Sequence, residues 1–497
     1  MTNSLSSGSA ASAAPGTRRV LGREEMLAIG RKLLAASDRW YSVNVEHVSN
    51  ALTKVANGRV LTTQDGDRVR FYLASRYGSG LPVSIDANQL NDKTLQRVLD
   101  AVERMGPPRP PASEQEPDDP DDPQYFTYNA KPIPPVSLYY ESSVAAMDTA
   151  RAEAIPAIIE QIHDAGLIGA ATVGSIARSV VYVYKQGLTA FAEETDNEVT
   201  VTARSPDGTG SGWAGAAHRD WSKIAPTAVT ARAIELSKMS RHPVALEPGR
   251  RTAILGPAAV AQLVYAMAPA FEGERVRRRY SPLSDLTGVG GRTTKLGRRV
   301  FDPRLQLVSD PADPNGGFPP FFELGGLEYR VWGYPTSAVT WIDKGILTNL
   351  AYDALGSSSR RLPAADVPRS ACLTTVPGTT TATIDEMIAN CKEGVYVNRF
   401  SDIDVVDEKT MLMTGVTRDG CFFVKDGKIS KPIKNFRFTE SPFFSFNKVE
   451  MVGVSERVAF GAPRVRSEFQ LRWPRLPVIA PPMMVQDFNF TATADAV

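Results

Sequence analysis

The sequence predicts an α+β protein with two domains, and three observations lead to this expectation. In the first half, apolar residues repeat with the helical period in some segments and alternate as half-buried strands do in others. The second half mostly has the pattern of short strands and turns, with one strongly apolar helical segment near its start. A chain of 497 residues is also long enough for two or more hydrophobic cores. We therefore expect an N-terminal α+β domain at residues 21–246. A C-terminal, antiparallel, barrel-like β domain with a buried central helix should occupy residues 247–497.

Residues 1–20 are rich in serine, alanine and glycine and lack the apolar stretch of a secretory signal. Such a composition predicts a disordered leader. The first folded element is then a helix over residues 22–38, in which Met26, Ile29 and Leu33 share one face.

Alternating patterns predict strands over residues 42–47, 59–64 and 68–77. The last two strands are separated by Asp65-Gly66-Asp67, a turn sequence suited to a hairpin. A second amphipathic helix follows over residues 95–105 and is stopped by a glycine and two prolines. The first part of the chain is thus predicted to be a unit of helices and sheet.

Residues 107–135 are dense in proline and acidic side chains. This composition forms no core and prefers extended conformations, so we expect a surface loop. The loop could also be a docking strap for a basic partner, but solvated acidic loops are much commoner and the simpler interpretation is favoured.

A long alanine-rich helix is predicted over residues 142–165, with a kink at Pro156. Beta-branched, alternating segments then predict four strands, at residues 170–177, 179–184, 188–193 and 198–204.

The glycine run at residues 208–212 lacks the Lys-Ser/Thr of a phosphate-binding loop, so a hairpin turn is the better interpretation. A helix over residues 222–240 leads to a turn at residues 247–250, which we take as the domain boundary.

The central helix should begin at Gly256-Pro257, because a proline in the first helical turn loses no hydrogen bond. Four apolar residues at helical spacing form its buried stripe, namely Val260, Leu263, Val264 and Met267. The helix should end or kink at Pro269, which lacks a backbone donor. Further on, Asp343-Lys344-Gly345 and Asp426-Gly427 predict hairpins, and a helix is expected at residues 384–392.

This region resembles the TldD/PmbA (TldE) family of metallopeptidase-related proteins. In the TldD branch the helix carries H-E-x-x-x-H followed by G-L-E-G-D, and residues 270–274 (Ala-Phe-Glu-Gly-Glu) match the second motif. The two histidine positions then fall on Val264 and Pro269, and the catalytic glutamate position on Tyr265. Valine and proline have no ligand atom for zinc, and a tyrosine with a pKa of roughly 10 is a poor general base.

The resemblance continues toward the C-terminus in the order and spacing of short motifs, which include Tyr280-Ser281-Pro282-Leu283, Asp310-Pro311, an eroded F-D-D-E-G at residues 322–326, Thr414-Gly415 and Lys431-Pro432-Ile433-Lys434. The third zinc ligand of the TldD branch is a cysteine near the C-terminus, and residues 456–497 contain none. The ending is similar to that of the TldE branch, which is zinc-free. The resemblance therefore implies no metal or other cofactor and no catalytic residue in this chain.

Glu272 is the candidate cleft residue, since the family keeps an acidic side chain at this position. Without zinc, it could hold Arg275, Arg277 or the N-terminus of a neighbouring element. The basic run at residues 275–279 is interpreted as a solvated face, with contact to an acidic partner as the alternative.

Composition limits the remaining possibilities. Lysine plus arginine (56) nearly balances aspartate plus glutamate (55), so nucleic acid and anionic membranes are not expected partners. The three cysteines have no paired spacing, and the four histidines have no ligand at helical spacing. The cysteine pattern predicts reduced thiols, and we expect a cytoplasmic protein.

The leading functional hypothesis is a TldE-like, non-catalytic subunit that pairs with a TldD-like, zinc-bearing subunit, the dimer degrading or trimming peptides. The alternative is a stand-alone peptide-binding or structural homologue without peptidase activity. A third possibility is a hydrolase that uses unrelated chemistry.

Overall fold

The computed structural model describes residues 18–36, 40–75, 83–88, 91–104, 133, 135–185, 187–288, 293–321, 335–352, 371–459 and 477–494. Residues 1–17 of the expected leader and nearly all of the proline-rich loop at residues 107–135 lie outside these ranges. Arg18 and Val20, expected in the leader, belong instead to the folded part. Arg18 donates to Asp148 at 2.9 Å, and Val20 is buried.

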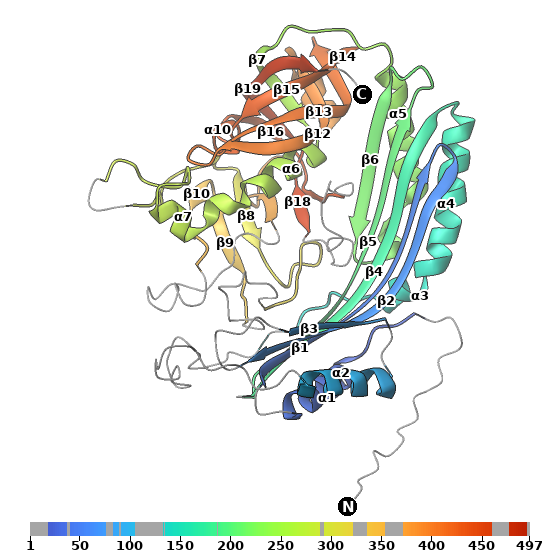
Figure 1. Ribbon diagram of the computed structural model, residues 1–497. Coiled ribbons are helices and arrows are strands. Elements are labelled where there is room, and N and C mark those ends of the chain that lie inside the picture. Colours follow the sequence, from blue (N-terminus) through green and yellow to red (C-terminus); the bar gives the residue numbers. More distant parts are fainter. Residues whose placement is uncertain are drawn as a thin grey trace, which may run out of the picture.

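A six-stranded sheet forms the N-terminal part, with the strand order β3-β2-β1-β4-β5-β6 and antiparallel pairing throughout. Its strands are β1 (Trp40–Ala56), β2 (Arg59–Ser75), β3 (Val83–Ala87), β4 (Ile168–Tyr184), β5 (Thr189–Arg204) and β6 (Ser211–His218). Its helical segments are α1 (Arg23–Ala35), α2 (Asp92–Arg104), α3 (Glu141–Ala145), α4 (Met147–Asp164), the 3₁₀ turn η2 (Trp221–Lys223) and α5 (Pro226–Met239). The long helices cover the convex face of the sheet, and the C-terminal part lies on its concave side (Figure 1).

Alternation along the strands gives the two faces of this sheet different chemistry. Val45 and Val181 pack with Met26 and Leu27 of α1 in one hydrophobic cluster. The side chains in between, such as Glu46 and Arg178, point to the concave face and are charged although buried. These two charged side chains therefore face the C-terminal part.

The expected hairpin turn at Asp65-Gly66-Asp67 is wrong. These residues lie within β2 and pair with Ala51, Asn50 and Ser49 of β1. The chain turns instead at Asn57-Gly58, where both residues have positive φ (50° and 71°) as a type I′ turn requires.

Other boundaries also differ from expectation. Residues 170–177 and 179–184 form the single strand β4, and residues 188–193 and 198–204 belong to the single strand β5. The helix expected over residues 142–165 is interrupted at Ala146, between α3 and α4, whereas Pro156 lies inside α4. The glycine run at residues 208–212 leads from β5 into the antiparallel β6, as the hairpin interpretation predicted.

Five strands of the C-terminal part close into a barrel in the order β12-β7-β19-β15-β13, because β12 also pairs with β13. They are β7 (Gly249–Leu255), β12 (Glu393–Asp407), β13 (Leu412–Lys425), β15 (Asn435–Glu440) and β19 (Met483–Ala494). β14 (Lys428–Pro432) pairs with β13, and β16 (Val449–Val452) pairs with β19. The barrel is antiparallel as expected except between β7 and β12, which run parallel.

A second sheet has the order β10-β9-β8-β11-β18-β17. Its strands are β8 (Leu305–Ser309), β9 (Val339–Asp343), β10 (Ile346–Leu347), β11 (Ala371–Thr375), β17 (Glu456–Arg457) and β18 (Val478–Ala480). β11 and β18 are parallel. The predicted hairpins at Asp343-Lys344-Gly345 and Asp426-Gly427 connect β9 to β10 and β13 to β14.

Helix α6 (Pro257–Met267) lies between the barrel and the second sheet (Figure 1). Its buried residues share one hydrophobic core with Phe400 and Val485 of the barrel and Leu307 and Leu373 of the second sheet. The shorter helical segments are η3 (Ala268–Phe271), α7 (Gly273–Arg277), α9 (Ile384–Asn390) and α10 (Pro442–Ser445). The α+β class with a barrel-like β domain and a buried central helix is therefore confirmed. No helix within the described ranges is long and apolar enough to cross a membrane.

Candidate functional site

The central helix forms where the sequence predicts it. Gly256 is the N-cap in an extended conformation, Pro257 is the first helical residue, and the stripe of Val260, Leu263, Val264 and Met267 is buried. The α-helix ends at Met267, and Pro269 lies in the 3₁₀ turn η3 that follows. Proline removes the backbone donor that another α-helical turn would need.

The three degenerate motif positions do not converge on one point. Val264 is 1% exposed and belongs to the hydrophobic core, whereas Tyr265 is 60% exposed. Pro269 is also exposed. A zinc ion requires nitrogen, oxygen or sulfur ligands that share one centre. The residues at these positions do not fit a zinc ion.

Other metal-binding and thiol chemistry is also missing from the described part of the chain, where no group of three or more His, Cys, Asp or Glu side chains could hold a metal ion. All three cysteines are buried, and none of them forms a disulfide bond. Burial raises the pKa of the Cys391 thiol to about 11 and that of Cys421 to about 12. Both thiols are therefore protonated and unreactive near neutral pH.

Glu272 lies just after η3 and is half-exposed. Its Oε2 accepts a hydrogen bond from Arg275 Nε at 2.8 Å, and Arg275 Nη1 lies 2.9 Å from Glu408 Oε1. Lys409 lies over the ring of Tyr280, 5.8 Å from its centroid. The candidate cleft residue is therefore part of an ion-pair chain on the surface.

The family motif around Glu272 has a structural role here. Gly273 N donates to Ala351 O at 2.7 Å, and a β-carbon on Gly273 would lie 2.1 Å from the Tyr352 ring, so this position needs glycine. Ser281 Oγ donates to Ala270 O at 2.6 Å, and Ser284 Oγ donates to Val276 O at 2.7 Å. These bonds fix the chain after α6.

Two arginines of the basic run at residues 275–279 share one carboxylate, that of Glu274. Glu274 accepts from Arg277 Nη2 at 2.6 Å and from Arg278 Nε at 2.8 Å. These hydrogen bonds lower the pKa of Glu274 to about 2. This arrangement agrees with a solvated face.

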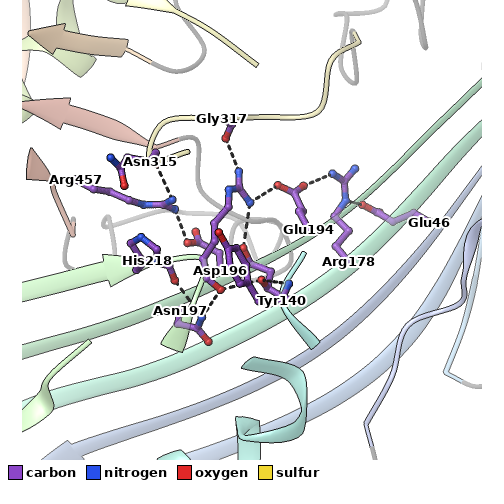
Figure 2. A network of polar contacts seen from close by, with 12 residues as sticks. Glu46, Tyr140, Arg178, Glu194, Asp196, Asn197, His218, Asn315, Gly317 and Arg457 are labelled. Atoms are coloured by element: carbon purple, nitrogen blue, oxygen red, sulfur yellow. Dashed lines mark hydrogen bonds and ion pairs between the residues drawn. The ribbon is translucent and has the colours of Figure 1, made fainter. Parts of the chain in front are cut away.

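A second polar site, which we call the buried ion chain, consists of Glu46, Arg178, Glu194 and Arg219. Figure 2 labels the first three of these residues. Arg178 Nε donates to Glu46 at 2.5 Å and its Nη1 to Glu194 Oε1 at 2.9 Å. Arg219 Nη1 donates to Glu194 Oε2 at 2.9 Å, and its Nη2 donates to the backbone oxygen of Gly317 at 2.6 Å. All four side chains are buried, so their mutual attraction must compensate for lost hydration.

The last of these bonds reaches the C-terminal part, and so does a second ion pair. Arg457 Nη2 donates to Asp196 at 2.5 Å and its Nη1 to the backbone oxygen of Asn315 at 3.0 Å. Burial, followed by the charge of Arg457, lowers the pKa of the nearby His218. The concave face of the N-terminal sheet is thus tied to the C-terminal part by buried charges (Figure 2).

The buried ion chain was not among the sites predicted from the sequence. Glu194, at its centre, is buried between Arg178 and Arg219. The available signal was a charged residue at alternate positions of otherwise apolar strands, seen in Arg178 and Glu194. Strand pairing, which places these two residues opposite each other, could not be read from the sequence.

Comparison with known proteins identifies one family. The PmbA/TldA metallopeptidase C-terminal domain matches residues 248–492. A search of curated proteins found no match.

Several solved structures share the fold over nearly the whole chain. A proposed modulator of a DNA gyrase from Thermotoga maritima is 15% identical with a TM-score of 0.69, over 94% of this chain and 99% of that one. TldE from Thermococcus kodakarensis is 14% identical with a TM-score of 0.67, over 93% and 99%. A proposed modulator of DNA gyrase from Bacteroides thetaiotaomicron is 16% identical with a TM-score of 0.62, over 93% and 98%.

Proposed function

Since the chain belongs to the TldD/PmbA family of metallopeptidase-related proteins, we propose that it is the non-catalytic, TldE-like subunit of a two-subunit peptidase. In this proposal a separate TldD-like chain supplies an intact H-E-x-x-x-H helix and the zinc ion. The two chains together degrade or trim peptides in the cytosol.

The observation that carries the proposal is a contrast. Backbone contacts hold the segment after α6 in place, whereas the motif positions lack zinc ligands. Ser281, Ser284 and Gly273 make backbone contacts around the end of α6. Val264 of the helix is packed in the core, and Pro269, in the 3₁₀ turn that follows the helix, has no ligand atom. Selection for a fold that presents a surface to a partner would retain such a frame without its zinc ligands.

Fold similarity to TldE of Thermococcus kodakarensis supports the assignment to this branch. The exposed ion-pair chain of Glu272, Arg275 and Glu408 is a polar surface at the end of the central helix. Charged side chains at such a surface can set partner choice and orientation.

The test is purification of this chain from its native cell, followed by mass spectrometry and peptide hydrolysis. We expect a TldD-like chain to co-purify and the pair to cleave an unstructured peptide. The chain alone should neither cleave that peptide nor hold stoichiometric zinc by elemental analysis. A partner variant with glutamine in place of its motif glutamate should still associate but should lose activity.

Two outcomes would contradict the proposal. Chelator-sensitive hydrolysis by the isolated chain would make it the enzyme itself. Peptide binding without any co-purifying homologue would favour a stand-alone peptide-binding protein.

A further inference from the structure

A polar pocket of about 460 Å³ lies on the concave face of the N-terminal sheet, over β1 and β2. The side chains that matter for its chemistry are Glu46, Val48 and Asn50 of β1, Arg68 and Arg70 of β2, and Asn88 just after β3. These residues lie beside the buried ion chain, which begins at Glu46. The pocket is distinct from the degenerate motif on α6.

Two of the charged groups in the pocket are already committed to protein partners. Glu46 is bound by Arg178 at 2.5 Å. Arg70 donates through Nε to Asp86 Oδ1 at 2.6 Å and through Nη1 to the Tyr72 hydroxyl at 3.0 Å. These groups shape the pocket and do not need a ligand.

Arg68 differs from Arg70. Its Nη1 atom is buried yet has no hydrogen-bond acceptor, since the nearest carboxylate oxygen, Asp86 Oδ2, lies 3.7 Å away. A charged donor left in this way is costly unless an acceptor reaches it. The Arg68 side chain as a whole is 27% exposed, so a ligand can approach its solvent-facing atoms while Nη1 itself stays covered.

Two amide side chains, Asn50 and Asn88, line the same pocket as Arg68. A β-carbon on Gly66 would come within 2.4 Å of Asn50 Oδ1, so glycine at this position lets the Asn50 side chain lie across the strand. Among the described residues, neither Asn50 nor Asn88 has a side-chain hydrogen bond to the protein. An amide can both donate to a carboxylate and accept from a peptide N–H.

Two aspartates of β2 also line the pocket, but each already pairs with another cationic or hydrogen-bonding side chain. Asp65 is held by Arg18 Nη2 at 2.6 Å and Arg151 Nη1 at 2.8 Å. Asp67 accepts from His47 Nε2 at 2.5 Å. Both side chains are engaged on the convex face, where strand alternation places them.

We propose that this pocket binds the C-terminal carboxylate of a short peptide, with Arg68 as the charged donor. The amides of Asn50 and Asn88 contact the last peptide group, and Val48 supplies an apolar surface for the terminal side chain. The inference rests on the proposed function, because it assigns a recognition role for the peptide to the non-catalytic chain.

The test is calorimetric titration of the full chain, without any partner, with the tripeptide Ala-Ala-Ala and with its C-terminal amide. The free acid should bind roughly 10- to 100-fold more tightly than the amide, because a hydrogen bond to a charged group contributes about 1.5–3 kcal/mol. Arg68→Gln should weaken binding of the free acid by a similar factor and leave binding of the amide unchanged.

Arg59→Gln is the matched control, since Arg59 is an exposed arginine on the same strand. It should bind the tripeptide as the unmodified chain does. Asn50→Asp, which adds a negative charge inside the pocket, should abolish binding of the free acid while the thermal denaturation midpoint shows whether the fold is kept.

Equal affinity for the acid and the amide, or no effect of Arg68→Gln, would overturn the proposal. Displacement of the peptide by inorganic phosphate at the peptide's own concentration would show a general anion site and would also overturn it. Association with a zinc-bearing partner is measured separately by co-purification. Failure of the pocket is therefore distinguishable from failure of the proposed function.

Discussion

Arg457 of the C-terminal part donates a hydrogen bond of 2.5 Å to Asp196 of the N-terminal sheet. Burial lowers the pKa of Arg457, and the Asp196 carboxylate opposes this effect. Pairing therefore allows both charges to stay buried, where an unpaired charge would cost much free energy.

Arg457→Ala should destabilise the protein strongly, because it leaves Asp196 buried without its cation. We expect a loss of about 3–5 kcal/mol in the free energy of unfolding, measured by urea denaturation. Arg277→Ala removes an arginine from an exposed ion pair and serves as the control, for which we expect little change. Equal denaturation midpoints for the two variants would contradict a stabilising contact between the two parts of the chain.

Glu194→Gln should also be strongly destabilising, by about 3–5 kcal/mol, because Arg178 and Arg219 both depend on its charge. Glu193→Gln is the matched control on the neighbouring residue. Burial, with a contribution from Glu141, raises the pKa of Glu193, so a neutral side chain is tolerated there. Thermal denaturation of both variants at pH 7 tests the prediction, and a larger loss for Glu193→Gln would refute it.

His218 should make stability depend on pH. Its pKa is lowered in the folded state, first by burial and then by Arg457, so the unfolded chain binds the proton more readily. Stability rises with pH wherever the unfolded state binds more protons. The contribution of His218 is therefore present above its unfolded pKa of roughly 6.5 and is lost as the pH falls through the folded pKa.

The measurement is urea denaturation of the unmodified chain and of His218→Gln between pH 7 and pH 5. Other groups contribute equally to both proteins, so the difference isolates the histidine. The variant should lose less stability over this interval. A steeper loss in the variant would show that the folded state favours the protonated imidazole.

Local patterns predicted the helices better than the strands. The stripe on α6 and the end of this helix before Pro269 were predicted correctly, since proline acts through local geometry. The turn at Asp65-Gly66-Asp67 was wrong because continuous pairing of β2 with β1 outweighs the local turn preference. Asn57-Gly58 is the stronger hairpin sequence, but the turn was not predicted there.

The candidate sites show the same difference between features that are local in the sequence and features that depend on strand pairing. The loss of ligand atoms at Val264 and Pro269 is visible in the residue types alone. The partners of Arg68 and Glu194 depend on which strands are neighbours, and β1 pairs with β4 across more than a hundred residues of sequence. No local pattern specifies that register, so the pocket and the buried ion chain could be found only in three dimensions.

Rebuilding the motif by Val264→His, Tyr265→Glu and Pro269→His should not create a peptidase. Catalytic zinc generally needs three protein ligands, and residues 456–497 supply no cysteine as the third. Val264 also lies in the core, where an unpaired imidazole should cost about 1–3 kcal/mol of stability. Tyr265→Glu alone changes an exposed side chain and is the control for stability.

The deciding measurement is hydrolysis of an unstructured peptide by the triple variant with added zinc. We expect no turnover and weak zinc binding, because the imidazole at position 264 would point into the core and away from position 269. Clear, chelator-sensitive turnover would mean that a third ligand already lies within reach. The chain would then be a recently silenced enzyme, and its frame around α6 would be a remnant of catalysis with no need for a partner to explain it.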